Sequence, residues 1–407
     1  MRTKLHSVGL LALVASTAAA WSCRDIPQAP IVTPPAAPAY VTLTLDTLNG
    51  AGLDLGNMWG GVTALVAPDQ SVHVMALDLW DGVLHYYGCA NVCDDGAHWA
   101  RGIADSAGFA SVGGTAGVVL TNRGIEVVFS YEPVQTPWLR YVTCPGACNF
   151  TRNWTGATTT ANWEEPWWSG DSPLAADAAG GLHVLFYDPA DRLMHYGYCG
   201  GACTTTSSWQ DVALDGASIG AWVGAHLITV AASGGVHVFY GTPAGLFHAT
   251  CDAGCTSAVS WQATPIPGAH FLDAPRAMAA AFSPDGTLHF AFSDGAGQVT
   301  YATCAAPCAA GSPWSLASLP ITAGDVSLAS DAQGRVYLAT IDSTVVVSRC
   351  DSGCPAASWH SVRVPAARGG GHVAIAVDSA GLPTVASSFS RGPQILQVTR
   401  FIGWPAP

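Results

Sequence analysis

The sequence predicts an all-β protein, a seven-bladed β-propeller of four-stranded antiparallel blades that is closed by the N-terminal strand, which completes blade 7. Three observations carry this prediction. A segment with two cysteines recurs six times with a period of 46 to 55 residues, a segment with a tight turn recurs seven times, and helical periodicity is absent. Short strands that repeat at this spacing are typical of a propeller.

The segment with the tight turn supplies the first two strands of each blade. Its seven copies span 67–78, 121–132, 177–188, 231–241, 283–294, 331–342 and 378–388. Most copies place Asp, Asn or Ser near a Gly and continue into a β-branched or aromatic run, which predicts a hairpin. The residues before the turn are small, as the crowded innermost strand of a radial sheet requires.

The cysteine segment supplies the outer two strands. Each copy has an apolar or aromatic run, a cysteine, three residues, a second cysteine and a tryptophan; the copies span 84–99, 139–154, 193–209, 246–261, 299–314 and 345–359. We expect the third strand to end at the first cysteine and the fourth to begin at the tryptophan.

The two ends of the chain complete one blade together. The seventh unit, 372–401, has three strands, and residues 40–46 have no unit of their own. We therefore expect residues 40–46 to lie beside 394–401, with Tyr40 in the place of the repeated tryptophan. This pairing removes the open sheet edge that would invite aggregation.

The chain ahead of the propeller has the features of an exported protein. Residues 1–22 combine Arg2 and Lys4 with an apolar centre and three alanines, which predicts a signal peptide. Residues 23–39 form a Pro/Ala-rich tether, with five prolines between 24 and 39, and 40–407 form the propeller. The sequence around Cys23 resembles a bacterial lipoprotein box. We predict lipidation of Cys23 and an outer-membrane or cell-surface lipoprotein; the alternative is cleavage after Ala20 and ordinary secretion.

Composition limits the partners. The formal net charge is −13, with 49% hydrophobic and 11% charged residues. Nucleic acids and anionic lipids attract basic surfaces, so we expect no nucleic acid partner, and membrane contact only through a lipid anchor at Cys23. We expect a monomer.

Twelve of the 13 cysteines fall in Cys-x3-Cys pairs. In an exported chain such pairs predict disulfides. A zinc site would need two pairs to converge, whereas a ring of blades holds them apart, so we expect neither a metal nor a cofactor. The predicted disulfides are Cys89–Cys93, Cys144–Cys148, Cys199–Cys203, Cys251–Cys255, Cys304–Cys308 and Cys350–Cys354.

Tryptophans concentrate in the connections from the second to the third strand and from the fourth strand to the next blade. These connections share one face of a propeller, and aromatic platforms beside acids suit pyranose rings. The alternative is that the tryptophans cap the blade junctions. The predicted ligand-binding residues are Trp59, Trp80, Trp138, Trp163, Glu164, Glu165, Trp167, Trp168 and Trp222.

Histidines recur on the second strand of four blades, at His73, His183, His237 and His289. Equivalent places in separate blades do not converge on one site. We therefore expect buried imidazoles that bond a neighbouring strand, as buried polar groups require. The same interpretation applies to His85, His195 and His248 of the third strands.

The motif D-x-x-G-x-[LV]-H-[VF]-x-[FY], followed by an aromatic strand, resembles that of bacterial secreted β-propellers with sialidase-like (BNR-type) repeats. The resemblance spans about 40–407 and implies the fold. The Asp-box and the arginine trio of a sialidase are not reproduced. We predict a non-catalytic cell-surface or secreted protein that binds a glycan or a protein. The alternatives are a sialidase-like glycoside hydrolase or polysaccharide lyase, with Glu164 or Glu165 acting beside Asp188 or Asp273, and a pure protein-interaction scaffold.

Overall fold

The structure is a computed structural model, and contacts divide the chain into residues 1–36 and residues 37–407. The described residues are 38–48, 59–78, 83–106, 116–131, 138–162, 173–188, 190–218, 225–242, 245–269, 277–364, 371–389 and 394–404. The predicted signal peptide and Cys23 lie outside them, as does the predicted tether apart from Pro38 and Ala39. Within the described residues, no helix is long and apolar enough to cross a membrane.

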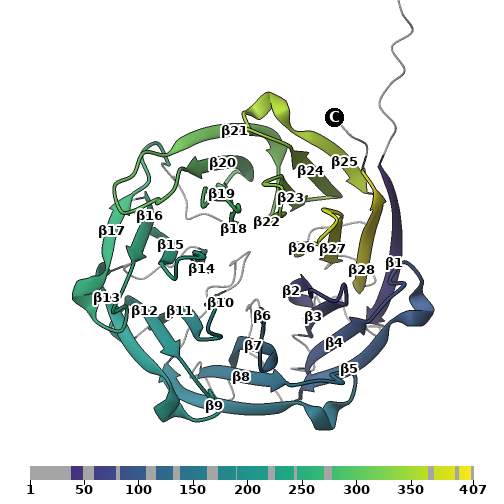
Figure 1. Ribbon diagram of the computed structural model, residues 1–407, viewed down its shortest axis with the longest axis horizontal. Helices are drawn as coiled ribbons and strands as arrows, with labels where there is room; N and C mark the ends of the chain where they lie inside the picture. The colour runs from purple at the N-terminus through teal and green to yellow at the C-terminus, as the bar shows by residue number, and fades with distance from the viewer. Residues whose placement is uncertain are drawn as a thin grey trace, which may run out of the picture. The chain divides into compact units, whose positions relative to one another are not determined.

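Seven four-stranded antiparallel sheets form the blades of the propeller, as predicted (Figure 1). We name the strands of a blade a to d from the axis outward. Blade 1 is β2 (Trp59–Val66), β3 (Val72–Asp78), β4 (Val83–Cys89) and β5 (Ala100–Asp105), and blade 2 is β6 (Gly117–Thr121), β7 (Gly124–Tyr131), β8 (Trp138–Cys144) and β9 (Thr155–Asn162). Blade 3 is β10 (Leu174–Ala176), β11 (Leu182–Asp188), β12 (Leu193–Cys199) and β13 (Gln210–Ser218), and blade 4 is β14 (His226–Val230), β15 (Val236–Thr242), β16 (Gly245–Cys251) and β17 (Gln262–Pro265). Blade 5 is β18 (Ala277–Phe282), β19 (Leu288–Ser293), β20 (Gln298–Cys304) and β21 (Ser315–Thr322), and blade 6 is β22 (Asp325–Ser330), β23 (Val336–Ile341), β24 (Val345–Cys350) and β25 (His360–Val364). Blade 7 is β26 (Val373–Val377), β27 (Pro383–Ser388), β28 (Gln394–Gly403) and β1 (Ala39–Leu48).

The innermost strands close a ring around the axis. Each a strand contacts the a strand of the next blade, from β2 through β6, β10, β14, β18 and β22 to β26, which contacts β2 again. The hydrophobic clusters of the core lie between neighbouring blades, such as the one shared by β4 of blade 1 and β7 of blade 2. Each blade therefore buries its faces against two neighbours, which is why the fold needs no helices to cover its sheets.

The ring closes as the sequence predicts. β1 pairs antiparallel with β28, with Tyr40 opposite Phe401 and Asp46 opposite Leu396 (Figure 1). Tyr40 packs on Phe401 at 5.3 Å between ring centroids. Trp404 adds a ring contact to blade 6, at 6.4 Å from Tyr337, and both Tyr40 and Trp404 pack against the hydrophobic cluster that blades 6 and 7 share.

All six predicted disulfides are present, each between cysteines four residues apart at the end of a c strand. In every blade but the fifth and seventh, a 3-10 turn of three residues separates the disulfide from the d strand, which begins one residue after the tryptophan; these turns are η1 (Gly96–His98), η2 (Thr151–Asn153), η3 (Thr206–Ser208), η4 (Ala258–Ser260) and η5 (Ala356–Ser358). These short turns were not predicted from the sequence, because three residues show no periodicity.

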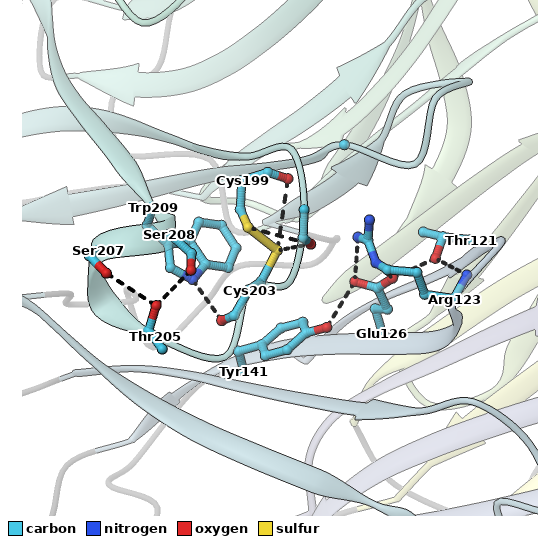
Figure 2. Close-up of a disulfide and its surroundings, with 12 residues drawn as sticks. Thr121, Arg123, Glu126, Tyr141, Cys199, Cys203, Thr205, Ser207, Ser208 and Trp209 are labelled. Atoms are coloured by element: carbon cyan, nitrogen blue, oxygen red, sulfur yellow. Dashed lines mark hydrogen bonds and ion pairs between the residues drawn. A yellow bond between two sulfur atoms is a disulfide. The ribbon is translucent and has the colours of Figure 1, made fainter.

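The repeated tryptophan joins neighbouring blades. In blade 3 the Trp209 indole donates a hydrogen bond from Nε1 to the carbonyl of Cys203 at 3.1 Å, and its ring packs on Tyr141 of blade 2 at 6.2 Å (Figure 2). The same indole–carbonyl bond occurs in blades 1, 2 and 4. The disulfide thereby holds a tryptophan that contacts the preceding blade.

The b-strand histidines bond neighbouring strands, as predicted; His183, His237 and His289 are buried and His73 is partly buried. Nδ1 of His183 lies 2.7 Å from the Tyr196 hydroxyl on the c strand. In blade 2 Glu126 stands at this position, fully buried, and accepts from Arg123 and from the Tyr141 hydroxyl (Figure 2). These side chains serve the cohesion of each blade.

Candidate functional site

The antiparallel order gives the propeller two faces. The a–b turns and the c–d loops with their disulfides lie at one end of the strands, which we call the cysteine face. The b–c and d–a connections lie at the other end, which we call the tryptophan face. Trp59 and Trp138 are the first residues of β2 and β8, so the structure places both backbones at the tryptophan face.

The other predicted ligand-binding residues lie outside the described residues: Trp80, Trp163, Glu164, Glu165, Trp167, Trp168 and Trp222. Of the two acids weighed as catalytic partners, Asp273 also lies outside them, and Asp188 ends β11 at the tryptophan face. The predicted site therefore stays a prediction.

A groove between blades 5 and 6 is part of the described structure. It has a volume of about 340 Å³ and runs along the outer strands, from residues 319–322 at the end of β21 to the d strand of blade 6. Trp359, Ser361 and Arg363 line it from β25 and the residue before it. These three residues alternate along the strand and therefore point to the same side. Asp342, Ser343 and Thr344 of the b–c connection close the end at the tryptophan face.

Two charged side chains of the groove have no ion-pair partner within the described residues. Arg363 and Asp342 are both exposed, and neither forms a salt bridge to a described residue. Other described arginines are bound to carboxylates; the pairs are Arg101–Asp46, Arg123–Glu126, Arg140–Asp105, Arg335–Asp331, Arg349–Asp351 and Arg400–Asp378. Arg363 and Asp342 thus keep hydrogen-bonding capacity for a ligand.

Trp359 gives the groove an aromatic wall. Its ring is half-buried and packs edge-on against Tyr301 of blade 5 at 5.0 Å. Its Nε1 has no hydrogen-bond partner within the described residues, unlike the indoles of blades 1 to 4. A groove lined by an indole, hydroxyls, a guanidinium and a carboxylate offers a chain of sugar rings both an apolar face and polar partners.

This groove was not predicted from the sequence. Trp359 belongs to the repeat and was assigned to structure, and the side chains around it come from two blades. Two features of the sequence could have indicated the groove. Trp359, Ser361 and Arg363 alternate along one strand, and Asp342 lies in a short b–c connection.

A second polar group lies on the tryptophan face of blade 3. His195 is buried between two carboxylates, with Nε2 2.9 Å from Asp191 and Nδ1 2.9 Å from Asp211. Burial lowers the pKa of His195, but the hydrogen bonds and charges of Asp211 and Asp191 outweigh burial and raise it above its ordinary value. The imidazolium form can donate to both, which ties the b–c connection to β13.

Similarity to solved structures supports the fold and does not assign a function. No protein-family model and no curated protein matches the sequence. Among solved structures, the polysaccharide lyase Uly1 has a TM-score of 0.54 at 10% identity, over 89% of this chain and 98% of that chain. An ulvan lyase of a new polysaccharide lyase family, bound to -[GlcA(1-4)Rha3S]-, has a TM-score of 0.54 at 11% identity, over 84% and 93%. A mutant of the Aleuria aurantia lectin in complex with α-methyl-L-fucoside has a TM-score of 0.43 at 14% identity, over 72% and 96%.

Proposed function

We propose that this protein binds glycans, in a groove between blades 5 and 6 and at the tryptophan face, without chemically altering them. The observation that carries the proposal is this groove, which runs from Trp359 to Arg363 and Asp342, two charged groups without ion-pair partners among the described residues. An oligosaccharide that lies along the groove can stack one ring on the indole, while a further ring exchanges hydrogen bonds with the guanidinium, the carboxylate and the neighbouring hydroxyls. The tryptophan-rich connections of blades 1 to 4 would extend the contact surface.

Binding is favoured over catalysis because most of the described arginines are already paired with carboxylates of this chain. A sialidase-like enzyme brings three arginines together on one substrate carboxylate. Six arginines of this chain are instead bound to acids within their own or an adjacent blade. Among the described residues that line the groove, Asp342 is the one that carries a carboxylate, whereas most glycoside hydrolases use two.

Six disulfides indicate an extracellular or secreted protein. We propose in addition that residues 1–22 direct export and that Cys23 carries a lipid anchor, with the tether holding the propeller off the membrane. Metabolic labelling with palmitate tests the anchor: labelled protein is expected in cells that process lipoproteins, and label that persists in Cys23→Ser would contradict it.

A polysaccharide pull-down and a glycan array test the binding function with the full mature chain. Binding is expected for at least one glycan, and Arg363→Gln and Asp342→Asn should each weaken it about tenfold, the effect of one lost charged hydrogen bond. Arg152→Gln is the matched control, because Arg152 contacts Phe150 in a c–d loop of the cysteine face. Binding that is absent, or equal in all variants, would overturn the groove as the site.

The same polysaccharides serve to test catalysis. We expect no new reducing ends and no unsaturated sugar absorbance after incubation with the wild-type protein. The predicted tryptophan face is tested by Trp163→Ala and Trp167→Ala, which should weaken the retention of polymers more than that of short oligosaccharides. Cleavage that is lost in Glu164→Gln or Glu165→Gln would replace the binding function by an enzymatic one.

A further inference from the structure

Blade 4 differs from the other histidine blades in how its b-strand imidazole is bonded. In blades 1, 3 and 5 the Nδ1 atom pairs with a tyrosine hydroxyl of the c strand, at 2.6 to 2.7 Å. The Nε2 atom pairs with an oxygen from the a–b turn. The turn partners are Ser71 for His73 at 2.8 Å, Asp177 for His183 at 3.2 Å and Ser283 for His289 at 3.0 Å.

In blade 4 both partners are exchanged. His248 stands where the other blades have tyrosine, and its Nε2 lies 3.0 Å from Nδ1 of His237. The residues that end the a–b turn are Ala231 and Gly235, which have no side-chain oxygen. Nε2 of His237 consequently makes no hydrogen bond to any described residue, although His237 is only 3% exposed.

The hydrogen bond between His237 and His248 indicates which ring nitrogen of each imidazole carries the proton. Burial lowers the pKa of His237 to about 4 and that of His248 to about 3, so both rings are neutral at neutral pH. Nδ1 of His248 is buried without a partner among the described residues. A bare nitrogen lone pair there costs less than an orphaned N–H, so His248 carries its proton on Nε2 and donates to His237. His237 then carries its own proton on Nε2.

This Nε2–H faces a cavity on the cysteine face. The cavity has a volume of about 670 Å³ and is bounded by the a–b turns of blades 4, 5 and 6 together with residues of two c–d loops. Its walls are mostly small residues, with Phe282, whose ring lies 5.0 Å from that of His237. Neither lysine nor arginine is among the described residues that line it, and Asp331, one of the two carboxylates in that lining, is bound to Arg335 and Tyr337.

The other carboxylate, Asp252, faces the same space as His237. A Cβ added at Gly235 would lie 3.2 Å from the Asp252 Oδ1 atom and 3.6 Å from the His237 Nε2 atom. The Ser233 Oγ atom would lie 3.8 Å from the same Cβ, so glycine at this position keeps open a gap bordered by the His237 imidazole, the Asp252 carboxylate and a hydroxyl.

We propose that this cavity is a second binding site, which takes a neutral ligand with vicinal hydroxyl groups, such as a single pyranose unit. One hydroxyl accepts the hydrogen bond from Nε2 of His237, its neighbour donates to Asp252, and the apolar edge of the ring lies toward Phe282. The volume falls in the range of about 300 to 1,000 Å³ typical of small-molecule sites. The site is independent of the groove in the proposed function, because it lies among the a–b turns of blades 4 to 6 and shares no residue with the groove.

NMR of the ¹⁵N-labelled full mature chain tests the site. Methyl glycosides of neutral hexoses are titrated in, and the imidazole Nε2–H signal of His237 is expected to shift and saturate. The decisive variant is Ala231→Ser, which copies the serine of blade 5 and gives Nε2 an internal partner. This variant should be no less stable than wild type and yet bind about tenfold more weakly. Ala178→Ser, an exposed change in the a–b turn of blade 3, is the matched control and should bind like wild type.

Two further probes separate ligand classes. The methyl uronide of the same sugar should bind more weakly, because the described lining of the cavity has no cationic side chain and Asp252 repels a carboxylate. Tetramethylammonium should leave the His237 signal unmoved. The proposal is wrong if no neutral glycoside shifts this signal, if the cation alone does so, or if Ala231→Ser binds as tightly as wild type. Loss of glycan binding in Arg363→Gln with an intact response at His237 would concern the groove alone.

Discussion

Asp46 is the side chain through which the closing strand is bound to the next blade. It lies on β1, the outermost strand of blade 7, and accepts a hydrogen bond from the Tyr87 hydroxyl of blade 1 at 2.5 Å. The guanidinium of Arg101, also in blade 1, lies 2.9 Å from the same carboxylate oxygen. Tyr87 is 2% exposed, whereas the Arg101 side chain is 53% exposed. The two partners should therefore contribute unequally.

The magnitudes follow from burial. A buried hydrogen bond to a charged group contributes about 1.5 to 3 kcal/mol, and removing one partner leaves the other unsatisfied. An exposed ion pair contributes about 0 to 1 kcal/mol because water screens it. We expect Asp46→Ala to lower the free energy of unfolding by about 2 to 3 kcal/mol, Tyr87→Phe by about 2 kcal/mol, and Arg101→Gln by less than about 1 kcal/mol.

Urea unfolding of the three variants and of the double variant Asp46→Ala/Tyr87→Phe gives the coupling energy directly. Because both single changes remove the same hydrogen bond, the double variant should lose about 1 to 2 kcal/mol less than the sum. Hydrogen exchange supplies a second readout, since the amides of β1 should exchange faster in Asp46→Ala while those of β22 do not. Equal losses in Asp46→Ala and Arg101→Gln, or unchanged exchange in β1, would refute this account of ring closure.

Three more expectations concern stability. Val92 has a φ of 50°, and the equivalent residue of blade 6 is Gly353, with a φ of 62°. Glycine tolerates this conformation better than valine does, so Val92→Gly should raise the unfolding free energy by about 0.5 to 1 kcal/mol and Gly353→Val should lower it. Urea midpoints that move in the same direction in both variants would contradict this. Burial lowers the pKa of His237 and His289 to about 4, so the stability from their neutral forms is complete above about pH 6.5 and is lost as pH falls through about 4. Urea unfolding should already show this loss between pH 6.5 and 5, above the range in which most carboxylates take up protons. Burial raises the pKa of Tyr86 to about 12, so its contribution is complete below about pH 10 and is lost as pH rises through about 12; tyrosinate absorbance that develops fully by pH 11 in the folded protein would be contrary to this.

The fold could be predicted from the sequence because its signals are local and repeated. Each cysteine pair lies within one loop, so the pairing needs no knowledge of distant contacts. The closing strand was predicted from a shortage of one strand at one end and a surplus at the other, and Tyr40 does stand opposite Phe401. Trp404 was not predicted as a further contact with blade 6, because it follows the last strand, where no repeat supplies a template.

The groove could not be predicted in the same way. Its lining comes from β21 and β25, which belong to different sheets, and no local pattern states which residues of neighbouring blades face each other. The prediction of the tryptophan face had a different basis, the topological rule that b–c and d–a connections share one end of the strands. That rule holds for the backbones of Trp59 and Trp138 and leaves the other seven predicted residues as hypotheses.

Because the blades repeat, the hydrogen bonds of a polar side chain in one blade can be compared with those at the same position in the others. Blade 4 differs from blades 1, 3 and 5 in this comparison. A serine at position 231 would give Nε2 of His237 an internal partner, as Ser283 does for His289 in the adjacent blade, and such a hydrogen bond contributes about 0.5 to 1.5 kcal/mol. Blade 4 has alanine at this position and glycine at 235, so the turn forgoes this hydrogen bond and leaves the Nε2 atom facing the cavity. Blade 4 thus departs from the bonding pattern of blades 1, 3 and 5. It loses a stabilising hydrogen bond and gains a hydrogen-bond donor that a ligand can reach, as is expected at a binding site.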